Sequence, residues 1–316
     1  MMTDLSKESN FISALFYLCD DEKECSELIA RVGNVLQNNF KNYELVIVDD
    51  SRRTSDHAAI KAVSEKLSGL VSIVRMSQHF GVQDALNAAA DIAIGDFIIE
   101  FEYSDLDFED DLIMQAYRKA LEGYDVVSAV PKGKSRMASK WFYNLYNKHS
   151  RGKYPLNTER FRIESRRAVN RVNAMTDSIV YRKALFRNCG LKCADVLYDP
   201  KQTEAGRKRD SGERFDLAFD SLLLFTDVAS YCSMFISVAM MAFALFSLIY
   251  TVVIYLLGKP IEGWTTTMVF SSFAFFGLFA ILTIIIKYLA VMLNLLFRKK
   301  SHLIESVEKL VNEQSR

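Results

Sequence analysis

The feature that most constrains this chain is a pair of long apolar segments near its C-terminus. Residues 231–257 and 266–296 carry almost no charge. Each segment exceeds the roughly 20 apolar residues that cross a bilayer, and two buried core helices are a poor alternative at such lengths. The connection "GKPIEG" is short. We therefore predict two transmembrane helices in residues 231–297, arranged as a hairpin that returns the chain to its starting side.

Basic residues on both flanks of this hairpin predict its orientation. "RKRDSGERF" precedes the first segment and "FRKK" follows the second, and such residues stay on the cytoplasmic side. The N-terminus "MMTDLSKESN" is polar and does not resemble a secretory signal. We therefore predict a cytoplasmic domain in residues 1–214, an interfacial amphipathic helix in 215–230 and a cytoplasmic tail in 298–316. The tail is expected to form a short amphipathic helix.

Overall charge and cysteine spacing argue against nucleic-acid binding and against a zinc site. Lysine and arginine together number 39, as do aspartate and glutamate, so the net charge of zero predicts no nucleic-acid partner. The five cysteines form no repeated CxxC pairs of the kind that bind zinc. Free thiols fit a reducing compartment.

Short apolar runs alternate with helical patterns in residues 1–214. Strands are predicted at 11–19, 43–50, 71–76 and 96–102, and helices at 24–38, 58–67 and 82–93. This alternation predicts an α/β domain with a mainly parallel sheet that is covered by helices on both faces. Ligands of such sheets bind beyond the carboxyl ends of the strands.

Polar residues follow each of these strands and are therefore expected at one edge of the sheet. They are, in chain order, Asp20 and Asp21, Asp49 and Asp50, Gln78 and His79, and the acidic segment "FEYSDLDFEDD" at 101–111. A dinucleotide fold or a P-loop is not supported, because neither GxGxxG nor GxxxxGK[ST] occurs. Carboxylates in this arrangement suit a hard divalent cation that carries phosphate oxygens.

Several of these segments resemble the family 2 glycosyltransferases with a GT-A fold. "ISALFYLCDDEKE" is similar to the family's opening strand and acidic turn, and "YELVIVDDSRRTSD" to its second strand and aspartate pair. "MSQHFGVQDALNAAADIAIGDFII" is the most specific match, and "ERFRIESRRAV" resembles the family's "D-F-R-L-x-x-R" segment. With the two apolar segments, the chain resembles the membrane-anchored branch that includes dolichol-phosphate mannosyltransferases and bactoprenol glucosyltransferases.

The resemblance implies a set of site residues. A nucleotide-sugar site would comprise Asp20, Asp21, Asp49, Asp50, His79, Gly81 and Ser104, although His79 could equally pack in its loop. Mg²⁺ or Mn²⁺ would be held by Asp105, together with Glu102 if the strand end bulges or turns, or with Asp107 from the other side, and the catalytic residues would be Asp105, Glu159 and Arg162. For a lipid phosphate the resemblance implies Arg162, and further candidates, chosen because they precede the first apolar segment, are Arg207, Lys208, Arg209 and Arg214. The last four could instead set topology and bind anionic lipid.

The implied function is an inverting glycosyltransferase that moves a sugar from a nucleotide-sugar to a polyprenyl phosphate of the undecaprenyl type. It would act at the cytoplasmic face of a bacterial-type inner membrane, as a homo-oligomer such as a tetramer, in envelope polysaccharide synthesis or glycan modification. Two departures from the family pattern keep an alternative open: Tyr103 replaces an acid and Arg160 replaces an aspartate. The alternative is a catalytically inactive membrane subunit that acts in binding or assembly.

Overall fold

The structure is a computed structural model of the 316-residue chain. It describes residues 7–19, 22–52, 56–104, 106–133, 143–144, 146–148, 153–175, 181–201 and 304–310, and isolated helical residues at 239 and between 267 and 292. The chain divides into two compact units. The first comprises Met1–Asn147, Gly152–Arg214 and Lys299–Arg316, and the second comprises Lys148–Arg151 and Phe215–Arg298. All the described strands lie in the first unit.

The first half of the chain alternates strands and helices as predicted. In chain order the elements are β1 (Ile12–Leu18), α1 (Glu22–Asn39), β2 (Tyr43–Asp49), α2 (Ala58–Ser64), β3 (Leu70–Met76), α3 (Val82–Ile92) and β4 (Phe97–Phe101). Strand β1 pairs in parallel with both β2 and β4, and β2 pairs in parallel with β3. The predicted boundaries hold to within a few residues, because each strand is a short, almost fully buried apolar run.

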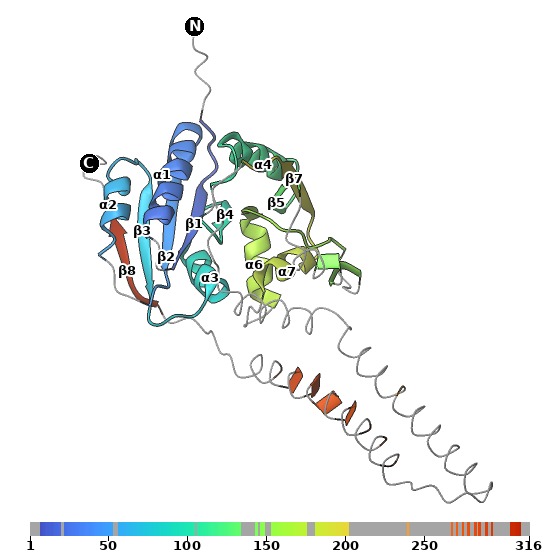
Figure 1. Ribbon diagram of the computed structural model, residues 1–316. Helices are drawn as coiled ribbons and strands as arrows, with labels where there is room; N and C mark the ends of the chain where they lie inside the picture. The colour runs from blue at the N-terminus through green and yellow to red at the C-terminus, as the bar shows by residue number, and fades with distance from the viewer. Residues whose placement is uncertain are drawn as a thin grey trace, which may run out of the picture. The chain divides into compact units, whose positions relative to one another are not determined.

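The second half completes a mixed sheet (Figure 1). Its elements are α4 (Asp111–Leu121), β5 (Val126–Pro131), β6 (Arg162–Ser165), α6 (Arg166–Met175), α7 (Arg182–Asn188), β7 (Cys193–Tyr198) and β8 (Ile304–Leu310). The described strands form one eight-stranded sheet in the order β7-β5-β6-β4-β1-β2-β3-β8. Strands β6 and β8 run antiparallel to their neighbours. The predicted α/β domain with a mainly parallel sheet is confirmed.

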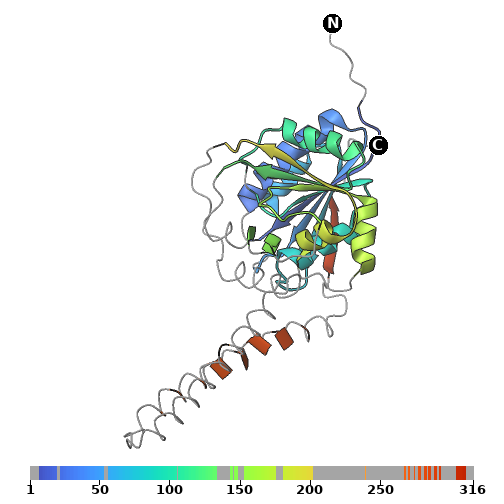
Figure 2. The ribbon, with the colours of Figure 1, turned by 90° about the vertical axis from the view of Figure 1, so that its right-hand side faces the viewer.

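Helices cover both faces of the sheet (Figure 2). On one face, α1 and α4 pack on an apolar cluster in which the Phe16 and Phe101 rings stack at 5.2 Å. On the other face, α3 packs on β1 and β2, and α6 packs on β6. Because side chains alternate along a strand, Ile99 and Phe101 face the α1 and α4 side, whereas Glu100 faces the opposite side. This alternation decides which charged groups can meet.

The carboxyl ends of β1, β2, β3 and β4 meet at one edge of the sheet. The register pairs Leu18 with Asp49 and Asp49 with Arg75 across the parallel strands. Strand β6 runs in the opposite direction, and its first residue, Arg162, pairs with Glu100 near the end of β4. The edge that the sequence predicted as the binding rim therefore also receives the start of β6.

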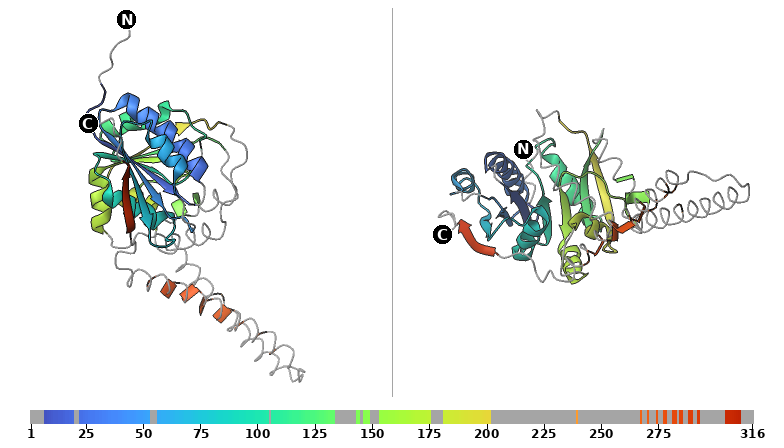
Figure 3. Two further views of the ribbon diagram at one scale, coloured as in Figure 1. Left: turned by 90° about the vertical axis from the view of Figure 1, so that its left-hand side faces the viewer. Right: turned by 60° about the horizontal axis from the view of Figure 1, so that its bottom comes forward.

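The C-terminal tail differs from its prediction. Residues 304–310 form strand β8 against the edge strand β3 rather than an amphipathic helix, with Val74 opposite Val307 (Figure 3). The spacing of Ile304, Val307 and Leu310 fits a helix, but β3 otherwise presents a row of unpaired N–H and C=O groups. Pairing with that edge overrides the local pattern, which is a contribution of tertiary structure.

Across the part of the chain that the structure describes, no helix combines the length and the apolar character needed to cross a membrane. The predicted interfacial helix at 215–230 and nearly all of the predicted hairpin at 231–297 lie outside the described residues.

Proline substitutions test the assignment of β8 as an edge strand. In a strand, neighbouring N–H groups point to opposite sides, so only one of Val307→Pro and Glu308→Pro should remove a hydrogen bond to β3. We expect one variant to abolish the slow hydrogen exchange of the 304–310 backbone amides and the other to retain most of it, as measured by mass spectrometry. Equal loss in both variants would instead indicate a helix.

Candidate functional site

Asp50 holds the loop that leads into α3. Its carboxylate accepts hydrogen bonds from the backbone N–H groups of Phe80 and Gly81, both at 2.8 Å, and from the Tyr17 hydroxyl at 3.1 Å. The His79 ring nitrogen Nδ1 lies 3.0 Å from the same carboxylate. Gly81 has φ +88° and ψ 163°, a conformation that residues with a side chain rarely adopt. Asp50, His79 and Gly81 are therefore brought together as predicted, with Asp50 as the centre of the loop.

Asp49 is also engaged by neighbouring groups. One carboxylate oxygen accepts the Ser51 N–H at 3.1 Å, and the other lies 3.3 Å from His57 Nε2 and 3.7 Å from Arg75 Nε. Its side chain is 4% exposed. The two aspartates that end β2 thus shape the rim through internal contacts, and Arg75 adds a cation that the sequence interpretation did not consider.

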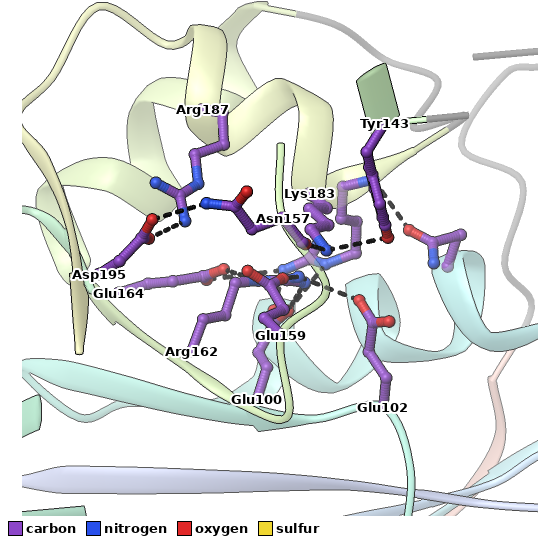
Figure 4. Close-up of polar contacts among 12 residues, drawn as sticks. Glu100, Glu102, Tyr143, Asn157, Glu159, Arg162, Glu164, Lys183, Arg187 and Asp195 are labelled. Atoms are coloured by element: carbon purple, nitrogen blue, oxygen red, sulfur yellow. Dashed lines mark hydrogen bonds and ion pairs between the residues drawn. The ribbon is translucent and has the colours of Figure 1, made fainter. Parts of the chain in front are cut away.

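Arg162 is the centre of a buried network of charges (Figure 4). Its Nε donates to Glu164 at 2.6 Å, its Nη1 donates to Glu159 at 2.7 Å and to Glu102 at 3.0 Å, and its Nη2 forms an ion pair with Glu100. Only 2% of the side chain is exposed. Four of the five N–H groups of a guanidinium are thereby used by protein carboxylates. Arg162 therefore positions acids at the rim, and a lipid phosphate would find almost no free donor on it.

The three most deeply buried carboxyl groups around Arg162 have pKa values that are shifted in different directions. Burial raises the pKa of Glu164 well above its usual value, and the nearby Glu100 raises it further. Burial acts in the same direction on Glu100, but the Arg162 and Arg182 cations outweigh it and lower its pKa. Burial also opposes ionisation of Glu159, yet Lys183, Arg162 and Arg187 lower its pKa to about 2. The raised pKa of Glu164 favours its neutral form, whereas the lowered pKa values of Glu100 and Glu159 keep them ionised.

Helix α7 supplies further cations to this network. Lys183 Nζ donates to the backbone carbonyl of Asn157 and lies 3.3 Å from the Tyr143 hydroxyl, and Arg187 pairs with Asp195 (Figure 4). Burial alone would lower the pKa of Lys183, but Glu159 and its other neighbours raise it, so the ammonium stays charged. The cations of α7 thus offset the acids that gather on β4 and β6.

Two of the three predicted metal ligands can be placed. Glu102 is 14% exposed at the end of β4, and its Oε1 accepts from Arg162. Asp107 instead forms an ion pair with Arg160 and accepts the Tyr198 hydroxyl at 2.9 Å. Asp107 therefore does not fit the predicted role of a metal ligand, because both its oxygens are bound to protein groups. The arginine that replaces the family's aspartate is its partner.

The remaining acids still fit a magnesium or manganese ion that is shared with a substrate. Such an ion is commonly held by one or two carboxylates together with phosphate oxygens and water. Glu102 meets this description, and Asp105, the third predicted ligand, lies outside the described residues. Within the described residues, no group of three or more histidine, cysteine, aspartate or glutamate side chains could hold a metal alone.

The sequence profile of Glycosyl transferase family 2 matches residues 22–190, which is more than half of the chain. The chain belongs to glycosyl transferase family 2. It is a glycosyltransferase, and the family together with the mixed sheet confirms the predicted GT-A, Rossmann-like class.

Relatives of this glycosyltransferase match it over most of its length. An uncharacterised glycosyltransferase of Synechocystis is 27% identical over 271 residues, covering 82% of this chain and 83% of that protein. The bactoprenol glucosyl transferase of Shigella phage SfX is 26% identical over 247 residues, covering 74% of this chain and 78% of that protein. The solved structure of a mannosyltransferase from Pyrobaculum calidifontis, in complex with GDP-Man and Mn²⁺, has a TM-score of 0.48 at 12% identity and covers 92% of this chain and 88% of that chain.

Of the remaining predicted site residues of the glycosyltransferase, Ser104 is half-buried shortly after β4. Those outside the described residues are Asp20, Asp21, Asp105, Arg207, Lys208, Arg209 and Arg214. Their roles remain predictions.

The structure also shows residues of the glycosyltransferase that the sequence interpretation missed. Glu100 lies inside the otherwise apolar strand β4 and Glu164 lies inside the buried part of β6, and a charge in a buried strand needs a partner. That rule could have marked both residues from the sequence. Arg182 and Lys183 carried no such signal, because a basic pair in a helical segment usually faces solvent.

Acidic pH should destabilise this network through Glu159. Its pKa is lowered from 4.5 to about 2, so its contribution to stability is fully present above pH 4.5 and is lost as the pH falls toward 2. At about 1.4 kcal/mol per pKa unit, the contribution is on the order of 3 kcal/mol.

Thermal unfolding of the purified full chain between pH 6 and pH 3 measures this effect. We expect the unfolding midpoint of the wild type to fall more steeply below pH 4.5 than that of Glu159→Gln, which lacks this titration. Glu109→Gln, at an exposed site, should follow the wild type and serves as the control. Parallel curves for wild type and Glu159→Gln would contradict the ionised state of Glu159.

Proposed function

We propose that this glycosyltransferase moves a sugar from a nucleotide-sugar donor to a polyprenyl phosphate acceptor, with inversion at the anomeric carbon. The observation that carries the donor half of the proposal is the acidic rim at the carboxyl ends of β2 and β4. Glu102 is held there by Arg162, and Asp50 holds the loop of His79 and Gly81 next to the end of β2. Ligands of open α/β sheets bind at such an edge.

The donor would lie along this rim with its base and ribose near β2 and its diphosphate near β4. Asp49 and Arg75 are the polar groups at the β2 end. When bound, Mg²⁺ or Mn²⁺ would stabilise the charge that develops on the leaving diphosphate. Glu102 and Asp105 are the residues that would hold the ion. Arg162 keeps Glu102 in place, and Asp107 holds the loop through Arg160 instead of binding the ion.

The chemical step is a displacement at the anomeric carbon. An oxygen of the acceptor phosphate forms the new bond to carbon, while the bond from that carbon to the diphosphate oxygen breaks and its electron pair leaves with the diphosphate. A phosphate is already anionic near neutral pH, so the step needs orientation rather than a strong base. This agrees with Glu159, whose low pKa makes it a weak base. An α-linked donor would give a β-linked product.

Two observations support a polyprenyl phosphate as the acceptor. Relatives of similar length from Shigella phages are named bactoprenol glucosyl transferases. The sequence also has two apolar segments long enough to span a bilayer, preceded by the basic residues Arg207, Lys208, Arg209 and Arg214. In this proposal the hairpin anchors the protein in a bacterial-type inner membrane, and the basic segment binds the acceptor's phosphate on the cytoplasmic side. The homo-oligomer stays a prediction of the family resemblance.

Calorimetric titration of the detergent-solubilised full chain tests the donor half. We expect one nucleoside diphosphate or nucleotide-sugar from a panel to bind in the presence of Mn²⁺ and to bind much more weakly without it. Glu102→Gln should weaken the Mn²⁺-dependent binding by at least the roughly 10- to 100-fold that follows loss of a group that only orients a ligand, because Glu102 would contact the ion itself. Asp107→Asn is the matched control from the same loop, and it should keep the metal dependence because Asp107 is bound to Arg160.

The acceptor half and the alternative function are decided by turnover. After the donor class is known, the wild type should transfer its sugar to polyprenyl phosphate in detergent, and the product should carry a β-linkage. If no nucleotide binds to a folded sample, the catalytically inactive subunit becomes the better description.

A further inference from the structure

Glu100 is shared by two arginines from different parts of the chain. Its side chain is fully buried, one oxygen pairs with Arg162 Nη2, and the other pairs with Arg182 Nη2. Both guanidinium groups also lie over the ring of Phe186, at 5.5 Å and 5.2 Å from its centre. Two planar cations are thus fixed against one carboxylate and one aromatic face, which leaves neither of them free to change its position independently.

Arg182 is itself fixed to α3. Its backbone N–H donates to Gln83 at 2.8 Å, and its Nη1 donates to Asn87 at 2.8 Å. Helix α3 begins directly after Gly81, in the loop that Asp50 holds at the rim. Arg182 therefore connects the helix behind the predicted nucleotide loop to the buried end of β4.

The connection continues from Glu100 to the rim through Arg162. The guanidinium of Arg162 is a rigid plane, so the position of Nη2 on Glu100 determines where Nη1 lies. That Nη1 donates to Glu102 at 3.0 Å. We propose that Arg182 is a positioning residue for the divalent cation: through Glu100 and Arg162 it sets the place of the Glu102 carboxylate. The inference rests on the proposed function, because it is that proposal which makes Glu102 a ligand of the metal.

Charge balance explains why Arg182 is needed for this purpose. Without Arg182, Glu100 would keep one arginine and leave an oxygen buried without a charged donor, and an unpaired buried charge is strongly unfavourable. Arg162 would then shift toward Glu100 and away from Glu102.

The test measures the affinity for Mn²⁺ rather than activity. The purified full chain is titrated with Mn²⁺ at a fixed concentration of the nucleoside diphosphate that the wild type binds, and bound Mn²⁺ is followed by electron paramagnetic resonance. We expect Arg182→Gln to weaken apparent Mn²⁺ affinity by about 10- to 100-fold, the range for groups that orient metal ligands. At saturating Mn²⁺ the number of sites per chain should return to the wild-type value.

Two further variants make the result specific. Arg182→Lys keeps the charge but loses the planar fork, so its Mn²⁺ affinity should lie between those of the wild type and Arg182→Gln. Glu164→Gln also alters a buried partner of Arg162, but Glu164 accepts from Nε and the amide oxygen of glutamine can accept the same hydrogen bond, so Mn²⁺ affinity should stay within twofold of the wild type.

Each outcome decides between the proposals. Loss of sites that excess Mn²⁺ does not restore would mean that Arg182 is needed only for folding, and unchanged affinity in Arg182→Gln would overturn the inference directly. If Arg182→Gln does not fold, Asn87→Ala, which removes one contact of Arg182, carries the test: weaker Mn²⁺ binding supports the inference and unchanged binding overturns it. If the wild type binds no nucleotide and no Mn²⁺, the proposed function itself fails.

Discussion

Buried charge is the constraint on which the candidate site at the sheet edge of this glycosyltransferase depends. Removing an ion from water is costly, so every charge that the sheet buries must find a partner of opposite sign. Arg162 pairs with four glutamate side chains, and α7 adds cations that balance the charge of these acids. A network of this kind fixes geometry more than it adds stability, since each member is costly as soon as its partner is lost.

This constraint changes the roles of the residues at the rim. A buried arginine with four carboxylate partners acts on the acids around it, so Arg162 is better understood as support for Glu102 and Glu159 than as a docking point for phosphate. Asp107 and Arg160 illustrate the same rule. Asp107 departs from its predicted role, and its ion pair with Arg160 connects the loop between β4 and α4 to the segment that precedes β6.

The register of the sheet is what makes these contacts possible. Strand β6 runs antiparallel to β4, so Arg162 stands opposite Glu100, and alternation along both strands directs Glu100, Arg162 and Glu164 to the same face. The aromatic cluster of Phe101 and Phe161 occupies the other face. One pair of short strands thus separates an apolar core from a charged site.

Local sequence patterns were enough to predict the order of strands and helices, the α/β class and the edge at which the polar residues collect. These features follow from local periodicity and from the fact that parallel strands end on the same side of a sheet, so residues close together in the sequence are enough to predict them. The tertiary structure alone decided the partners of Arg162, the pairing of Asp107 with Arg160 and the strand β8. Each of these joins segments that are distant along the chain, such as Glu100 with Arg182 or β3 with residues 304–310. The pairing of distant groups depends on which faces the packed sheet brings together, and local sequence patterns do not predict this.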